Sequence, residues 1–256
     1  MTDILLSKDE GEVITLTLND TPANTLSMEM MSSISIEIDH INASEKSKVV
    51  VVESSSEKIW CSGHSFYEVN EMIKNNDKSS QEKLFEECSK MLIKIRSSNK
   101  IFVAKVTGRQ YVAAGGLGLL GIMDSAFASK ETRFALSGIN FNFGCHQPNV
   151  SVSRTMPSKS NLELLLTGQP FNAERAQEVG LINECIENES LDQRIGLFCS
   201  QVCNHTSDVI AMTKNSLYKQ KQMSIEDAYN FTTKLMVDNL QLDETKKGVA
   251  SFFDKS

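Results

Sequence analysis

Two short apolar runs constrain the fold more than any other feature of this chain. Residues 48–53 read Lys-Val-Val-Val-Val-Glu, and residues 100–106 read Lys-Ile-Phe-Val-Ala-Lys-Val. Short runs that are rich in β-branched residues are typical of strands buried on both faces of a sheet. Helix-like segments alternate with such strands along the chain, and this alternation predicts an α/β architecture.

The segments around the two runs follow the same alternation. Residues 11–18 alternate with period two, as a strand does, and a helix is expected from Ser27, because serine is a favoured N-cap. Residues 70–80 are rich in Asn, Lys and Ser, which predicts a mobile surface segment before a helix over residues 81–96. Later helices are expected over residues 117–123, 161–166, 173–179, 191–202 and 224–240.

Charge and composition exclude several classes of protein. With 26 Lys and Arg against 33 Asp and Glu, the net charge of −7 provides no basic field for nucleic acid. Polar residues interrupt every long apolar run, and the acidic start resembles neither a secretory signal nor a transit peptide. The six cysteines form no CxxC pair, and Cys199, Cys203 and His205 lack a clear fourth metal ligand. We therefore expect a soluble cytoplasmic protein that binds no metal, nucleic acid or membrane.

Two glycine-centred turns are the candidate ligand-binding features. Residues 60–65 read Trp-Cys-Ser-Gly-His-Ser, and residues 113–117 read Ala-Ala-Gly-Gly-Leu. Glycine lets the backbone approach a ligand closely, and unpaired N–H groups at a helix start attract negative charge. Either turn taken alone is better explained as an ordinary turn between secondary-structure elements than as a binding site.

Five segments, over residues 18–26, 60–68, 114–124, 166–183 and 248–255, carry a more specific pattern. The fourth contains Leu-Thr-Gly followed by an acidic helix and Gly-Leu-Ile-Asn. Together, and in this order, they resemble the crotonase family, also called the enoyl-CoA hydratase/isomerase family, over essentially the whole chain. Ser-Gly-His at residues 62–64 and Ser-Gly-Ile-Asn at residues 137–140 are similar to its "enoyl-CoA hydratase domain-containing" branch.

The resemblance implies a crotonase-like fold of repeated ββα units over residues 1–190 and a C-terminal helical trimerisation subdomain over residues 191–256. It implies a homo-oligomer, a trimer or a hexamer, which binds an acyl-CoA thioester and needs no other cofactor. The thioester oxygen would lie between the N–H groups of Ser62 and Gly115, which stabilise an enolate. The implied CoA contacts are Ser62, Gly63, His64, Ser65, Phe252 and Lys255. A terminal helix with one packed and one solvated face explains the last two about equally well.

The two glutamates that perform hydration in this family are absent from the matching positions. Gly118 stands six residues before Asp124, and Gly138 stands four residues after Phe134. Glycine has no group that can transfer a proton. The sequence therefore argues against ordinary hydratase activity.

Four other side chains near the turns are candidates for chemistry. His64 and His146 carry imidazole, the side-chain type that ordinarily changes charge near neutral pH. Cys145 is a nucleophile if its pKa is lowered, and Glu68 is the carboxylate nearest the first turn. Each also has a structural explanation, such as shaping a turn, capping a loop or supporting a helix N-terminus. We select His146 and Glu68 as the candidate proton-transfer groups.

The sequence leaves three functions open. The first is an acyl-CoA enzyme, a lyase or isomerase, because isomerisation, decarboxylation and thioester hydrolysis can share one stabilised enolate. The second is a non-catalytic acyl-CoA-binding protein. The third is an oligomeric scaffold whose CoA site has decayed, against which the glycines at 63, 115 and 116 argue weakly.

Overall fold

The two apolar runs form neighbouring strands at the centre of the main sheet. In a computed structural model, which describes residues 3–253, β4 (Val49–Ser54) pairs in parallel with β7 (Ile101–Val106). Val50 and Val52 belong to a hydrophobic core on one face of the sheet, and Val49 and Val51 belong to a second core on the other. The strands are thus buried on both faces, and the predicted α/β class is confirmed.

Three sheets are formed within residues 3–253. The main sheet has the strand order β1-β2-β4-β7-β9-β12, a smaller sheet has the order β11-β10-β8-β5, and β3 pairs with β6. β1–β2 and β10–β11 are antiparallel, and the other pairs are parallel. The remaining strands are β1 (Leu5–Asp9), β2 (Val13–Leu18), β3 (Thr25–Leu26), β5 (Ile59–Cys61), β6 (Gly63–His64), β8 (Tyr111–Ala113), β9 (Ser125–Ser129), β10 (Arg133–Ala135), β11 (Phe171–Asn172) and β12 (Glu184–Ile186).

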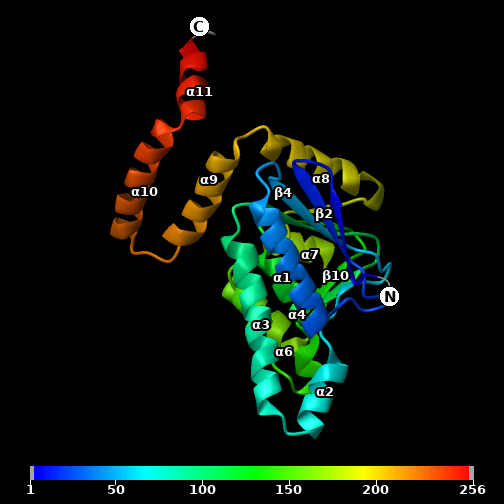
Figure 1. The fold of residues 1–256 in the computed structure, drawn as a ribbon. Coiled ribbons are helices and arrows are strands. Elements are labelled where there is room, and N and C mark those ends of the chain that lie inside the picture. Colours follow the sequence, from blue (N-terminus) through cyan, green and yellow to red (C-terminus); the bar gives the residue numbers. More distant parts are fainter. Residues whose placement is uncertain (1–2, 254–256) are drawn as a thin grey trace.

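Helices cover both faces of the main sheet. The larger core contains residues of α1 (Met28–Ala43) and α3 (Lys78–Ser97), and the smaller core lies under α8 (Asn188–Cys203) (Figure 1). α1 begins where the sequence predicts, because the Ser27 hydroxyl accepts a hydrogen bond from the Met30 N–H at 3.2 Å. The helices of the body are α1 (Met28–Ala43), α2 (Phe66–Lys74), α3 (Lys78–Ser97), α4 (Gly115–Ile122), the 3₁₀ helix η1 (Ser137–Phe141), α5 (His146–Val152), α6 (Ser158–Thr167) and α7 (Ala173–Glu178).

The C-terminal quarter is helical. It comprises α8 (Asn188–Cys203), α9 (Ser207–Gln220), α10 (Ile225–Gln241) and α11 (Asp243–Phe253). α8 packs against the main sheet, whereas α10 and α11 extend away from it and bury none of their described residues (Figure 1). The division at residue 190 and the trimerisation role of residues 191–256 stay predictions.

The segment over residues 70–80 differs from the expected mobile loop. α2 continues to Lys74 and α3 begins at Lys78, so the interruption is three residues long. Asp77 caps α3 by accepting a hydrogen bond from the Ser80 N–H at 3.0 Å. Polar composition alone misled the prediction, because these residues form the solvated faces of two helices.

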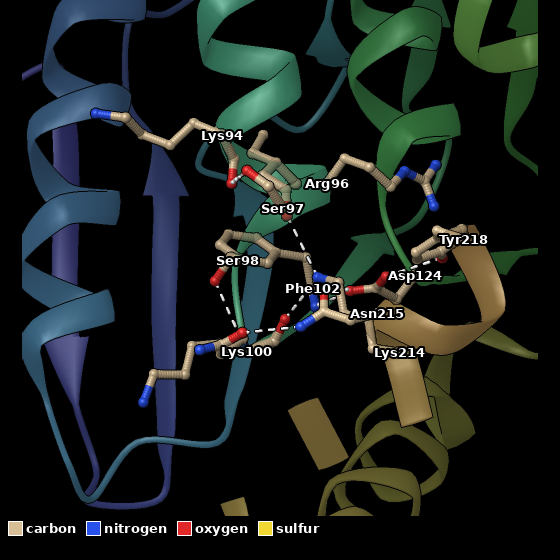
Figure 2. A network of polar contacts seen from close by, with 12 residues as sticks. Lys94, Arg96, Ser97, Ser98, Lys100, Phe102, Asp124, Lys214, Asn215 and Tyr218 are labelled. Atoms are coloured by element: carbon tan, nitrogen blue, oxygen red, sulfur yellow. Dashed lines mark hydrogen bonds and ion pairs between the residues drawn. The ribbon is translucent and has the colours of Figure 1, made fainter. Parts of the chain in front are cut away.

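A buried polar network fixes α9 to the body of the protein. The Lys214 ammonium donates to Asp124 Oδ2 at 2.8 Å and to the Lys100 carbonyl at 2.7 Å, and the Tyr218 hydroxyl donates to Asp124 Oδ1 at 2.9 Å (Figure 2). Only 2 % of the Lys214 side chain and 8 % of the Asp124 side chain are exposed. Burial lowers the pKa of Lys214, and the charge of Asp124 opposes that shift. An ion pair this deeply buried depends on both partners.

Two further features follow from the described part of the chain. No helix within residues 3–253 combines the length and the apolarity that crossing a membrane requires. The same residues contain no group of three or more His, Cys, Asp or Glu side chains placed to hold a metal ion.

Candidate functional site

The two glycine turns meet backbone to backbone. A Cβ atom built on Gly63, whose φ is +88°, would lie 2.5 Å from the Gly115 nitrogen. A Cβ built on Gly116 would lie 2.2 Å from the Cys61 carbonyl oxygen. Both separations are too short for any real side chain, so the contact between the turns requires glycine at these positions.

One backbone amide is left free where the turns meet. Gly115 is the first residue of α4, so its N–H has no partner within the helix, and no acceptor for it occurs among residues 3–253. The Ser62 N–H already donates to the Ala23 carbonyl at 3.1 Å, which corrects its expected role as a ligand donor. The His64 backbone nitrogen also lies beside Gly115, 3.4 Å from a Cβ built on that glycine.

The residue that precedes the free amide is held in a strained conformation. Ala114 has φ +46° and ψ −117°, a region that residues other than glycine rarely adopt. Its carbonyl accepts hydrogen bonds from Leu117 N–H at 3.1 Å and Gly118 N–H at 3.2 Å, so it starts α4. The strain is the cost of turning sharply from β8 into α4.

Replacing Ala114 by glycine should therefore stabilise the protein. Relief of the strain exceeds the extra chain entropy that glycine loses on folding, and we expect a gain of about 1 kcal/mol in the free energy of unfolding. Urea denaturation measures it. The control is Ala113→Gly in β8, which should destabilise by roughly 0.5–1 kcal/mol, the cost of glycine in a strand. Equal losses in both variants would contradict the strain at Ala114.

A cavity of about 500 Å³ opens beside the free amide. It is bordered by β3, β6, β8, α2 to α5 and the segment between β10 and α5. Its wall is mainly apolar and includes several aromatic rings, of which those of Phe66 and Phe141 touch edge to face with their centroids 5.2 Å apart. The aromatic lining residues are Phe66, Tyr67, Phe85, Tyr111, Phe141 and Phe143. Such a wall suits an apolar group.

The imidazole, amide and thiol side chains of the cavity come from β6 and from the start of α5. His64 from β6 and the pair His146 and Gln147 at the start of α5 line it together with Cys145. Burial lowers the pKa of His64, so its ring is neutral at pH 7, and burial raises the pKa of the Cys145 thiol. A thiol that stays protonated is a poor nucleophile, so the environment of Cys145 does not activate it.

Glu68 does not line this cavity. Its carboxyl group faces the backbone N–H of Met28 at the start of α1 and lies near Asp20. Burial raises the pKa of Glu68, the Met28 N–H opposes that shift, and the charge of Asp20 adds to it. The structure therefore brings His146 to the cavity but places Glu68 at a helix N-terminus, the structural role weighed for it from sequence.

Both positions that matched the absent glutamates are closed by backbone. A Cβ on Gly118 would lie 2.7 Å from the Cα of Pro148 in α5. A Cβ on Gly138 would lie 2.3 Å from the Phe143 carbonyl oxygen and 2.9 Å from the Cys145 sulfur. The segment that leads into α5 and the first turn of α5 thus occupy the space that two carboxylate side chains would need.

The other expected CoA contacts are distributed over two regions. The Ser65 hydroxyl caps α2 by accepting a hydrogen bond from the Glu68 N–H at 3.4 Å. Phe252 is 72 % exposed at the end of α11, where its ring meets that of Phe253. Lys255 lies outside the described residues. Contacts of all three with CoA stay predictions.

Gln147 is the site residue that sequence reasoning missed. Its Nε2 donates to the Phe85 carbonyl at 2.6 Å and to the Ser89 hydroxyl at 2.7 Å, both in α3. Its Oε1 is buried and has no hydrogen-bond partner within residues 3–253. Its position depends on α5 packing beside α3, a tertiary contact that no local pattern of the sequence indicates.

Comparison with known proteins gives a consistent result. The family model described as "Enoyl-CoA hydratase/isomerase" matches residues 8–256. A rat protein, "Enoyl-CoA hydratase domain-containing protein 3, mitochondrial", is 31 % identical over 237 residues, 93 % of this chain and 77 % of its own. The crystal structure of a Mycobacterium smegmatis enoyl-CoA hydratase superposes with a TM-score of 0.92 at 31 % identity, covering 99 % of this chain and 97 % of its own. That of human enoyl-CoA hydratase domain-containing protein 3 has a TM-score of 0.92 at 27 % identity, covering 99 % and 98 %.

The expected cytoplasmic location is wrong in light of these relatives. The frog, rat, human and mouse proteins of 29–31 % identity are all named mitochondrial. The prediction depended on reduced cysteines and on the lack of a recognisable signal. Reduced cysteines indicate a reducing compartment but do not say which one, so they do not select the cytoplasm.

Proposed function

Because this chain belongs to the enoyl-CoA hydratase/isomerase family, we propose that it binds an acyl-CoA thioester with the acyl group in the aromatic cavity and stabilises the thioester enolate. The observation that carries this proposal is the free N–H of Gly115, which opens into the cavity at the first turn of α4. A fixed donor of this kind stabilises negative charge that develops on a carbonyl oxygen. The second donor is the backbone N–H of His64, because the Ser62 N–H is already used.

The chemistry of the cavity favours enolate formation over hydration. Hydration needs an acid and a base placed to handle a water molecule at the double bond. No carboxylate lines the cavity within the described chain, and both glycines at the matching positions are closed by backbone. Reactions that need a stabilised enolate and one proton-transfer group fit this lining better. Binding without turnover is the second candidate function, which the same closure supports.

Titration with crotonyl-CoA and octanoyl-CoA tests the proposal. We expect calorimetry to detect binding of both esters, with octanoyl-CoA tighter because each additional buried CH₂ contributes about 0.8 kcal/mol. Loss of the enoyl-thioester absorbance of crotonyl-CoA reports hydration, and we expect little of it. Free CoA is the control for binding through the nucleotide alone. Absence of binding by either ester would contradict the proposed function.

We also propose that the protein self-associates through α10 and α11. None of the described residues of these two helices is buried. The helices expose large apolar side chains such as Tyr229, Met236 and Val249. Large apolar side chains exposed along two successive helices support an interface with another subunit. Sedimentation equilibrium distinguishes a trimer or hexamer, as expected, from a monomer, which would contradict the proposal.

A further inference from the structure

His64 occupies an unusual environment for a histidine. It follows the glycine of the first turn, lines the aromatic cavity, and stacks edge to face on Phe85 with ring centroids 5.1 Å apart. Both ring nitrogens are buried and lack a hydrogen-bond partner in the part of the chain that is described. Buried polar atoms are normally paired, so an unpaired imidazole in a cavity wall indicates a group that meets a ligand or carries a proton.

Gln147 is fixed beside this ring. Two hydrogen bonds to α3 hold its Nε2, at 2.6 Å from the Phe85 carbonyl and 2.7 Å from the Ser89 hydroxyl. The oxygen of the same amide is therefore directed away from α3, is unpaired, and lies close enough to the imidazole to favour its protonated form, as does the Leu26 carbonyl. A fixed amide oxygen beside the ring favours the tautomer whose N–H faces it.

We propose that His64 is the proton-transfer group of this site and that Gln147 positions it. The inference rests on the proposed function. The neutral imidazole takes a proton from the carbon next to the thioester carbonyl, and the electron pair of that C–H bond moves to form the enolate. The enolate oxygen is stabilised by the Gly115 N–H. Return of the proton from the imidazolium to the enolate regenerates both partners.

The other titratable groups of the cavity fit this role less well. Burial raises the pKa of Tyr111 and of Cys145, so both are protonated near neutral pH. His146 is exposed at the cavity edge, and Glu68 is outside it. No Asp, Glu, Lys or Arg lines the cavity within the described residues. His64 is the group that is buried, unpaired and neutral.

Deuterium exchange at the α-carbon of octanoyl-CoA is the test. The ester is incubated in D₂O with the full-length protein, and its mass reports deuterium uptake. We expect uptake with the native protein and a loss of about 10²–10⁴-fold in His64→Asn, the usual contribution of general acid–base catalysis. His40→Asn, in which an exposed histidine of α1 is replaced, should exchange at the native rate.

The pH profile separates proton transfer from a structural role. Burial lowers the pKa of His64, so the neutral base persists below its ordinary pKa near 6.5 and exchange is lost as the pH falls through the lowered value. Gln147→Glu places a carboxylate beside the imidazolium and raises that pKa, so the acid limb should move to higher pH. If the acid limb of the exchange profile in Gln147→Glu lay at the same pH as in the native protein, the positioning role of Gln147 would be overturned.

Calorimetry on the same samples separates the two proposals. Binding of octanoyl-CoA without exchange in the native protein would overturn the role of His64 and leave acyl-CoA binding intact. Exchange at the native rate in His64→Asn would also overturn that role. So would a loss of exchange in His146→Asn without a loss in His64→Asn. Absence of binding would overturn the proposed function and this inference together.

Discussion

We expect Gly63→Ala to reduce enolate formation by about 10²–10³-fold, the usual effect of losing one oxyanion donor. The new methyl group would lie 2.5 Å from the Gly115 nitrogen, so it must either cover the free N–H or push the two turns apart. In either case the Gly115 N–H can no longer donate a hydrogen bond to a ligand in the cavity. Deuterium exchange into octanoyl-CoA measures the effect, and calorimetry shows how much binding remains.

Gly108→Ala is the matched control for Gly63→Ala. Gly108 also has a positive φ, +54°, but a Cβ there meets no atom within 4 Å, so the variant carries backbone strain without closing the site. Strain of this kind costs on the order of 1–3 kcal/mol of stability in either variant. Equal losses of exchange in both variants would show that strain, and not occlusion of the Gly115 amide, is responsible.

We expect Lys214→Met to destabilise the protein by about 3–5 kcal/mol, the usual cost of breaking a buried ion pair. The variant leaves the Asp124 carboxylate buried with the Phe102 N–H at 2.8 Å and the Tyr218 hydroxyl at 2.9 Å, but without its ion-pair partner. It also leaves the Lys100 and Ile95 carbonyls without the ammonium that they bind. Urea denaturation measures the loss.

Lys90→Met is the control for this loss. Lys90 pairs with Glu87 on α3, and their side chains are 65 % and 39 % exposed. Exposed pairs of this kind contribute little to stability, because water and salt screen them. If Lys214→Met cost no more than Lys90→Met, the network in Figure 2 would not be what fixes α9 to the sheet.

The fold was predictable where local pattern and tertiary environment agree. The four valines of residues 49–52 are apolar at every position because β4 is buried on both faces, and Ser27 starts α1 because its hydroxyl satisfies a free N–H group. Residues 70–80 were mispredicted because solvated helix faces and loops share a polar composition. α9 was missed because its buried face includes Lys214, which is polar in sequence and is buried only through Asp124.

The sequence was sufficient to identify the two glycine turns of the site and two of its histidines. The two turns, Gly63 and Gly115, and the side chains of His64 and His146 were identified from sequence and meet at one cavity. Three features of the site were not identified from sequence. They are the hydrogen bond from the Ser62 N–H to the Ala23 carbonyl, the position of the Glu68 carboxyl group beside Met28, and the orientation of Gln147. Each of these depends on which segment packs opposite, so the residue itself carries no signal of it.

The segment between β10 and α5, together with the first turn of α5, connects these observations. It supplies Phe143, Cys145 and Pro148 to the space at Gly118 and Gly138, and it places Gln147 beside His64. Closing the two usual carboxylate positions and placing an amide beside an imidazole are thus consequences of one backbone path. We therefore expect this site to form an enolate in place of hydrating a double bond, and not to have lost its ligand.

Infrared difference spectroscopy of octanoyl-CoA labelled with ¹³C at the thioester carbonyl tests directly whether the Gly115 amide polarises the bound thioester. A carbonyl oxygen that accepts hydrogen bonds from the Gly115 and His64 amides is polarised, so its stretching frequency should fall on binding to the native protein. The shift should be absent in Gly63→Ala and present in Gly108→Ala. A bound ester whose carbonyl frequency equals that in water would contradict the account.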